Sequence, residues 1–99
     1  MTENIRDENE YTVFVGSKPF MNYVTGVVMQ FTTQNAPEVI VKARGKFMSK
    51  AIDVEEVTSK RFLSGQIEIR EVKIDSEEFK NKEGRQVRVS TIEIYLKRK

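Results

Sequence analysis

The decisive stretch of this sequence reads Val39-Ile40-Val41-Lys42-Ala43-Arg44-Gly45-Lys46. Its first three residues are apolar on both faces, which is typical of a strand buried inside a parallel sheet. Glycine at position 45 interrupts the pattern, so we expect a strand over residues 38–43. The stretch ends in a basic turn, Lys42-Ala43-Arg44-Gly45-Lys46, which we call the second basic turn. The first basic turn, Gly16-Ser17-Lys18-Pro19, follows the β-branched and aromatic run 11–15, which we expect to be the first strand.

Each basic turn leads into a run with helical periodicity. After the first turn, apolar residues recur at helical spacing at Phe20, Val24, Val27, Val28 and Phe31. In this first helix Ser17 is a candidate cap, and the adjacent proline suits the first turn.

After the second turn, a helix is expected over about residues 47–62. Its apolar side should carry Phe47, Ala51, Val54 and Phe62. Ser64-Gly65 should close it.

The last third of the chain alternates with a period of two. The runs 66–79 and 86–96 each shift parity once, so we expect a bulge or a change of buried face. At 14 and 11 residues they are about twice the usual strand length. A domain of this size cannot cover such strands completely. The polar turn 80–84 should therefore project from the body as the tip of an arm.

These elements predict a two-layer α/β (α+β) domain over residues 11–99, with two helices, a mixed four-stranded sheet and a long protruding C-terminal hairpin. The chain has 38% apolar and 32% charged residues, and its net charge is +2. Residues 1–10 carry one arginine and four acids, so they are expected to form a flexible acidic tail. The domain itself is therefore more basic than the whole chain.

Several classes of protein are disfavoured by composition. The chain has no cysteine and no histidine, so it lacks the usual general base, thiolate nucleophile and zinc ligands. We expect no enzyme activity, no metal and no cofactor. No apolar run is long enough to span a membrane, and the polar N-terminus is not a signal peptide. A cytoplasmic protein without a membrane partner is the expectation.

The two basic turns predict a surface for phosphate. Successive strand-to-helix crossovers bring their turns to the same edge of a sheet. This would gather Lys18, Lys42, Arg44 and Lys46 at the amino ends of two helices, where cations oppose the helix dipole and a bound anion relieves the conflict. Taken singly, Lys18 is explained as a surface lysine and Arg44 as the partner of a nearby acid.

The arm and three aromatic residues add further candidates. Lys80, Lys82, Arg85 and Arg88 surround the tip, which fits either a charged edge that blocks aggregation or a ribbon that enters a groove. Tyr11, Tyr23 and Phe62 are expected to be partly exposed. Tyr23 either stacks on a base or packs in the core, and Phe62 either caps the core or meets a second subunit.

Several runs in the right order resemble the Alba (Sac10b) family of archaeal chromatin proteins. They are Val13-Phe14-Val15-Gly16-Ser17-Lys18-Pro19, Met21-Asn22-Tyr23-Val24, Val41-Lys42-Ala43-Arg44-Gly45, Ala51-Ile52-Asp53 and Val89-Ser90-Thr91-Ile92-Glu93-Ile94. The resemblance implies a βαβαββ fold like the C-terminal domain of bacterial initiation factor three. It also implies a homodimer that binds double-stranded DNA, and RNA in many members, without strong sequence preference.

The resemblance also assigns roles to residues. Lys18 and Arg44 would contact nucleic acid, the arm would touch the minor groove through Arg85 and Arg88, and Arg61-Phe62 would pack dimers against each other along DNA. With their neighbours, the candidate nucleic-acid-binding residues are Ser17, Lys18, Asn22, Tyr23, Lys42, Arg44, Lys46, Lys82, Arg85 and Arg88.

Two positions depart from the family pattern. Many members have lysine, the reported acetylation site, where this chain has Ser17, and alanine is common where it has Phe47. Regulation by acetylation is therefore not expected at position 17.

The expected function is sequence-independent DNA binding and compaction at the chromosome. Two alternatives stay open. One is an RNA-binding subunit of a ribonucleoprotein that uses the same surface. The other is a protein-interaction module in which the hairpin adds strands to a partner.

Overall fold

The structure, a computed structural model, describes residues 11–99. The predicted acidic tail, residues 1–10, lies outside this range. Along the chain the elements are β1 (Thr12–Phe14), α1 (Phe20–Thr32), β2 (Glu38–Arg44), the 3₁₀ turn η2 (Gly45–Phe47), α2 (Met48–Val57), the π-helical turn η3 (Thr58–Phe62), β3 (Ile67–Lys80) and β4 (Gln86–Arg98).

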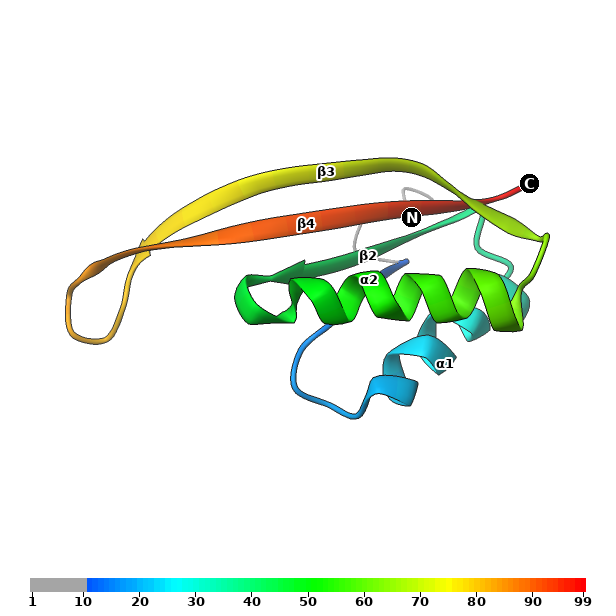
Figure 1. The fold of residues 1–99 in the computed structure, drawn as a ribbon, viewed down its shortest axis with the longest axis horizontal. Helices are drawn as coiled ribbons and strands as arrows, with labels where there is room; N and C mark the ends of the chain where they lie inside the picture. The colour runs from blue at the N-terminus through cyan, green and yellow to red at the C-terminus, as the bar shows by residue number, and fades with distance from the viewer. Residues whose placement is uncertain (1–10) are drawn as a thin grey trace, which may run out of the picture.

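The sheet has four strands in the order β1-β2-β4-β3. β1 pairs with β2 in parallel, and the other two pairings are antiparallel. Figure 1 shows both helices on the same side of this sheet, so the domain has two layers. The predicted two-layer α+β fold with a mixed four-stranded sheet is confirmed.

The core lies between the helices and one face of the sheet. Helix α1 contributes Val24, Val27 and Phe31, which pack with residues of β2 and β4. The most deeply buried strand residues are Val39, Val41 and Leu96, none of which is exposed to solvent. Side chains alternate along a strand, so the strand residues that flank these three point to the opposite face of the sheet. No described helix covers that face. We call it the open face.

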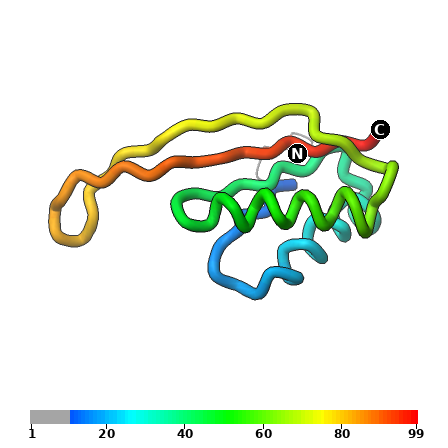
Figure 2. Tube along the Cα trace, viewed as in Figure 1, coloured from blue at the N-terminus to red at the C-terminus, as the bar shows by residue number. Residues whose placement is uncertain are grey.

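The hairpin of β3 and β4 extends beyond the body as the predicted arm. The continuous trace of Figure 2 shows its tip well beyond the start of α2, and the molecule measures 45 × 36 × 23 Å. The predicted parity shift in β3 is a bulge between Ile69 and Glu71. In β4 the register is continuous, and the apolar residues change face: Ile92 lies in the core, whereas Val87 and Val89 lie on the open face.

The second helical segment differs from the prediction in its last turn. Residues 58–62 form a π-helical turn, in which Leu63 N–H donates to the Thr58 carbonyl over 2.8 Å. The wider turn rotates Phe62 away from the side of Ala51 and Val54, and its side chain is 50% exposed. The prediction that Phe62 shares their apolar side is therefore wrong, whereas the expectation that it is partly exposed is confirmed.

The cap predicted for the first helix is also wrong. Helix α1 begins at Phe20 with Pro19 at the N-cap position and no side-chain cap hydrogen bond. Ser17 lies two residues earlier, in the turn. Proline has a suitable φ for a helix start, but it has no side-chain hydrogen-bonding group that replaces the missing cap.

One buried carboxyl group predicts a pH-dependent stability. Glu55 of α2 is only 3% exposed. Burial raises its pKa to about 7, a hydrogen bond with Glu56 acts in the same direction, and Ser59 and Lys60 oppose the shift. A raised folded-state pKa means that the native state binds more protons than the unfolded chain between the two pKa values. Stability should therefore fall as the pH rises from about 4.5 to about 7.

We expect Glu55→Gln to remove this decline and to raise the free energy of unfolding by about 1–3 kcal/mol near pH 8. Urea unfolding at about pH 5 and about pH 8, at a fixed protein concentration, measures the effect. Hydrogen bonds with Glu55 and Lys60 lower the pKa of Glu56. Its titration therefore changes stability only below about pH 4.5, outside the range that Glu55 controls. Equal pH dependence in wild type and variant would contradict the prediction.

Candidate nucleic-acid interface

The two basic turns lie at the same edge of the sheet, as the parallel crossovers predict. The turn after β1 and the turn after β2 both emerge on the side from which the arm projects (Figure 1). Lys50, in the first turn of α2, donates through Nζ to the carbonyl oxygens of Gly16, over 2.7 Å, and Lys18, over 2.6 Å. The first turn is therefore fixed against the start of the helix that follows the second turn.

Tyr23 holds the first turn from the side of the core. Its hydroxyl accepts a hydrogen bond from the Lys18 backbone N–H over 3.0 Å, and Lys50 Nζ lies 5.2 Å from the centre of its ring. The side chain belongs to the core and is 9% exposed, so the expectation that it is partly exposed is wrong. The helical spacing from Val27 and Phe31 favours the core for this residue, whose polar tip bonds the turn.

The side chains of the first turn point to solvent. Ser17 and Lys18 are exposed, as is Asn22 in the first turn of α1. In the second turn, Gly45 has a φ of 59°, which is left-handed and therefore favours glycine. The exposed Lys46 follows it, with Nζ 5.5 Å from the ring centre of Phe47. Phe47 itself is partly buried against the core.

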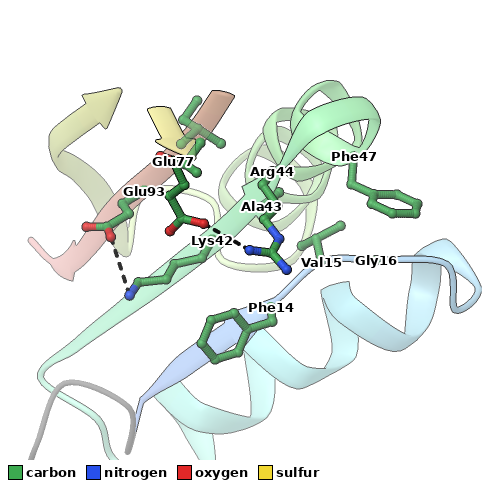
Figure 3. A pocket seen from close by; sticks show the side chains of 11 residues that line it. Phe14, Val15, Gly16, Lys42, Ala43, Arg44, Phe47, Glu77 and Glu93 are labelled. Carbon is green, nitrogen blue, oxygen red and sulfur yellow. Dashed lines mark hydrogen bonds and ion pairs between the residues drawn. The ribbon is translucent and has the colours of Figure 1, made fainter. Parts of the chain in front are cut away.

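Lys42 and Arg44 both lie on the open face, as their shared parity predicts. Lys42 Nζ lies 3.3 Å from the carboxylate of Glu93, and Arg44 Nη1 donates to Glu77 over 2.9 Å. Figure 3 shows these two ion pairs side by side above the ring of Phe14. Pairing of Arg44 with an acid, one of the two sequence interpretations, is thus present, and the acid comes from the arm.

The cations of the arm form the third part of the surface. Lys82 and Arg85 are exposed near the tip, where Asn81 Oδ1 accepts hydrogen bonds from the N–H groups of Glu83 and Arg85 over 2.9 and 3.0 Å. Further along β4, Arg88 Nε donates to Glu78 over 3.1 Å. The tip is thus ordered by its own asparagine, with two guanidinium groups close by.

Two other exposed regions lie away from the turns. Arg61 and Phe62 are exposed in η3, beyond the far end of α2. On β3, Ile69, Val72 and Ile74 are 46%, 46% and 72% exposed. They lie on the same face of the sheet as the core residues of β4 with which they pair. β3 is the edge strand, and among the described residues it pairs with β4 alone. We call these three residues the β3 apolar strip.

Three residues of this region were not singled out from sequence. Lys50 lies four residues after Lys46, which places both on one helical side, but nothing local in the sequence links it to the first turn. Glu77 is 33 positions from Arg44, and no local pattern links them. Phe14 differs from its strand neighbours only by alternation. It lies between Val13 and Val15, so its side chain points to the opposite face, where it is 62% exposed.

Neither a metal-binding cluster nor a membrane-spanning helix is found in residues 11–99. No cluster of three or more acidic, histidine or cysteine side chains in this range is arranged to hold a metal ion. None of its helices combines the length and apolar character that crossing a bilayer requires.

Comparisons with known proteins agree with the architecture. The Alba family model matches residues 11–76. A protein of Nanoarchaeum equitans named DNA/RNA-binding protein Alba is 54% identical over 88 residues, which cover 88% of this chain and 97% of the relative. One of the same name from Methanococcus maripaludis is 49% identical over 84 residues, 85% of this chain and 93% of the relative.

Solved structures of Alba proteins also match this chain. Alba from Thermoplasma volcanium matches with a TM-score of 0.80 and 46% identity, over 88% of this chain and 99% of that one. ALBA1 from Trypanosoma brucei shares the fold, with a TM-score of 0.72 at 18% identity over 95% of this chain and 72% of that one. By sequence and by structure, this chain belongs to the Alba family.

Proposed function

We propose that this chain binds double-stranded DNA without sequence preference, as a homodimer that coats and compacts the chromosome. The observation that carries the proposal is the pair of hydrogen bonds from Lys50, which fixes the first basic turn against the start of α2, next to the second basic turn and on the side of the basic arm. Exposed cations on a rigid edge neutralise backbone phosphates, and such contacts carry no sequence information. The names of its relatives, DNA/RNA-binding protein Alba, support the same class of ligand.

Dimerisation is proposed from the β3 apolar strip. β3 is a long edge strand, and exposed edges of this kind are normally covered or charged. Three neighbouring branched aliphatic side chains on one of its faces suit burial against a second copy. A dimer would double the turns to four and present two arms, which would enter the minor groove with Arg85 and Arg88. The exposed Arg61 and Phe62 would then join neighbouring dimers along DNA.

Lys18→Ala and Arg44→Ala are expected to weaken duplex binding about three- to tenfold each, and equally for unrelated sequences. The reason is that both side chains would contact phosphate rather than base edges. Fluorescence anisotropy with two duplexes of different sequence measures this. Lys97→Ala is the matched control, since Lys97 pairs with Glu68 at the opposite end of β4. A loss confined to one sequence would refute backbone recognition.

RNA is the second candidate ligand, because the names of the relatives include it. Double-stranded RNA has the A-form, with a deep, narrow major groove and a shallow minor groove. An arm adapted to the minor groove of DNA should therefore bind RNA duplexes less well. Competition between DNA and RNA duplexes of matched sequence separates the two, and preference for RNA would favour the ribonucleoprotein role.

A further inference from the structure

The open face of the sheet carries an aromatic side chain that packing does not explain. Phe14 of β1 lies between two residues of the core, so its ring projects from the opposite face and is 62% exposed. Lys42, its partner in the neighbouring strand, places Nζ 5.6 Å from the ring centre. An exposed ring with a cation beside it can act as a stacking platform for a base.

This ring borders a cavity of about 520 Å³. The polar lining consists of Lys42, Arg44, Glu77, Thr91 and Glu93, and the first basic turn contributes Gly16. Figure 3 shows that residues of β1, β2 and the arm converge on it. Its volume lies within the range of small-molecule sites, which is about 300–1,000 Å³.

The charges of the lining favour a neutral ligand over phosphate. The two cations are each paired with a carboxylate, at 3.3 Å for Lys42–Glu93 and 2.9 Å for Arg44–Glu77. A hydrogen bond from the Tyr95 hydroxyl, with help from Lys42, holds the pKa of Glu93 below its usual value, so this carboxylate remains an acceptor. A phosphate inside the cavity would face two negative charges. The side chain of Arg44 is 63% exposed, so its remaining N–H groups stay open to a backbone phosphate outside the cavity.

A nucleobase matches these groups better. It offers a flat face to the ring of Phe14 and an edge with both donors and acceptors. Carboxylates accept from the exocyclic amino groups of adenine, cytosine and guanine, while lysine and arginine donate to ring nitrogens and carbonyl oxygens. The lining supplies both kinds of partner within one cavity.

We propose that this cavity binds an unpaired, amino-bearing base, stacked on Phe14, in a nucleic acid whose backbone lies on the basic turns. The inference rests on the proposed function, since the turns would bring the strand to the cavity. Bases of an intact duplex are stacked inside it and cannot enter. The cavity would therefore add affinity only at bulges, flipped bases and single strands.

The test compares three short DNA duplexes: fully paired, with a single adenine bulge, and with an abasic bulge of the same backbone length. Wild type should bind the adenine bulge about fivefold more tightly than the abasic bulge, in line with the affinity that stacking on one aromatic residue adds. Phe14→Leu, which keeps an apolar side chain but removes the ring, should abolish this difference. Phe14→Tyr should preserve it, and all three proteins should bind the paired duplex equally.

Stacking is read directly with 2-aminopurine in place of the bulged adenine. Its fluorescence should change on binding to wild type and Phe14→Tyr, but not to Phe14→Leu. Equal affinity of wild type for adenine and abasic bulges would overturn the proposal, as would an equal loss on all three duplexes in Phe14→Leu. If wild type binds none of the duplexes, the proposed function itself fails. If wild type binds the paired duplex tightly and shows no preference for the adenine bulge, only the proposed base site is refuted and the proposed function stands.

Discussion

Raising the salt concentration from about 50 to about 200 mM should weaken duplex binding about 10³- to 10⁴-fold. A dimer with four basic turns and two arms would make about six to eight phosphate contacts, so log affinity should fall against log salt with a slope of roughly −5 to −7. Each contact releases condensed counterions, and added salt opposes that release. Anisotropy titrations at several salt concentrations give the slope.

The same titration checks which side chains contribute. Lys18→Ala and Arg44→Ala should each make the slope shallower by about one for every phosphate that the variant no longer neutralises, whereas Lys97→Ala should leave it unchanged. A flat dependence in wild type would refute the electrostatic mechanism. An unchanged slope in all variants would mean that other cations bind the backbone.

Ile74→Glu is expected to convert the proposed dimer to a monomer and to lower duplex affinity by about 100-fold, because the two halves would no longer bind as one bivalent unit. Ile74 is 72% exposed in the single chain, so the fold should tolerate the change. In a dimer the new carboxylate would be buried without a partner, which is unfavourable. Analytical ultracentrifugation and a duplex titration report the two effects.

Gln34→Glu is the matched control for Ile74→Glu. It adds the same charge at an exposed site in the connection between α1 and β2, which is not part of the β3 apolar strip. This variant should remain dimeric and lose little affinity. If Ile74→Glu also remains dimeric, the strip does not form the interface.

Elements with a strong local signal were predictable from sequence. The bounds of β2 were predicted to within a residue, because its run is apolar on both faces and ends at a glycine with left-handed φ. The arm was predicted because its strands are too long for the body to cover. Both conclusions depend on patterns within about 15 residues, where periodicity is informative.

Features that depend on tertiary packing were missed. The π-helical turn at residues 58–62 adds one residue to a helical repeat, and the local sequence gives no sign of it. The Arg44–Glu77 pair depends on how the arm lies over the open face, which the sequence of neither segment specifies.

The hydrogen bonds from Lys50 to the first turn have a consequence for the kinetics of binding. A glycine-containing turn would ordinarily lose conformational entropy when it closes on a ligand. Here one ammonium group ties the carbonyl oxygens of Gly16 and Lys18 to α2 in the free protein, so this ordering takes place during folding. Association should then be limited by diffusional encounter and orientation rather than by rearrangement of the turn.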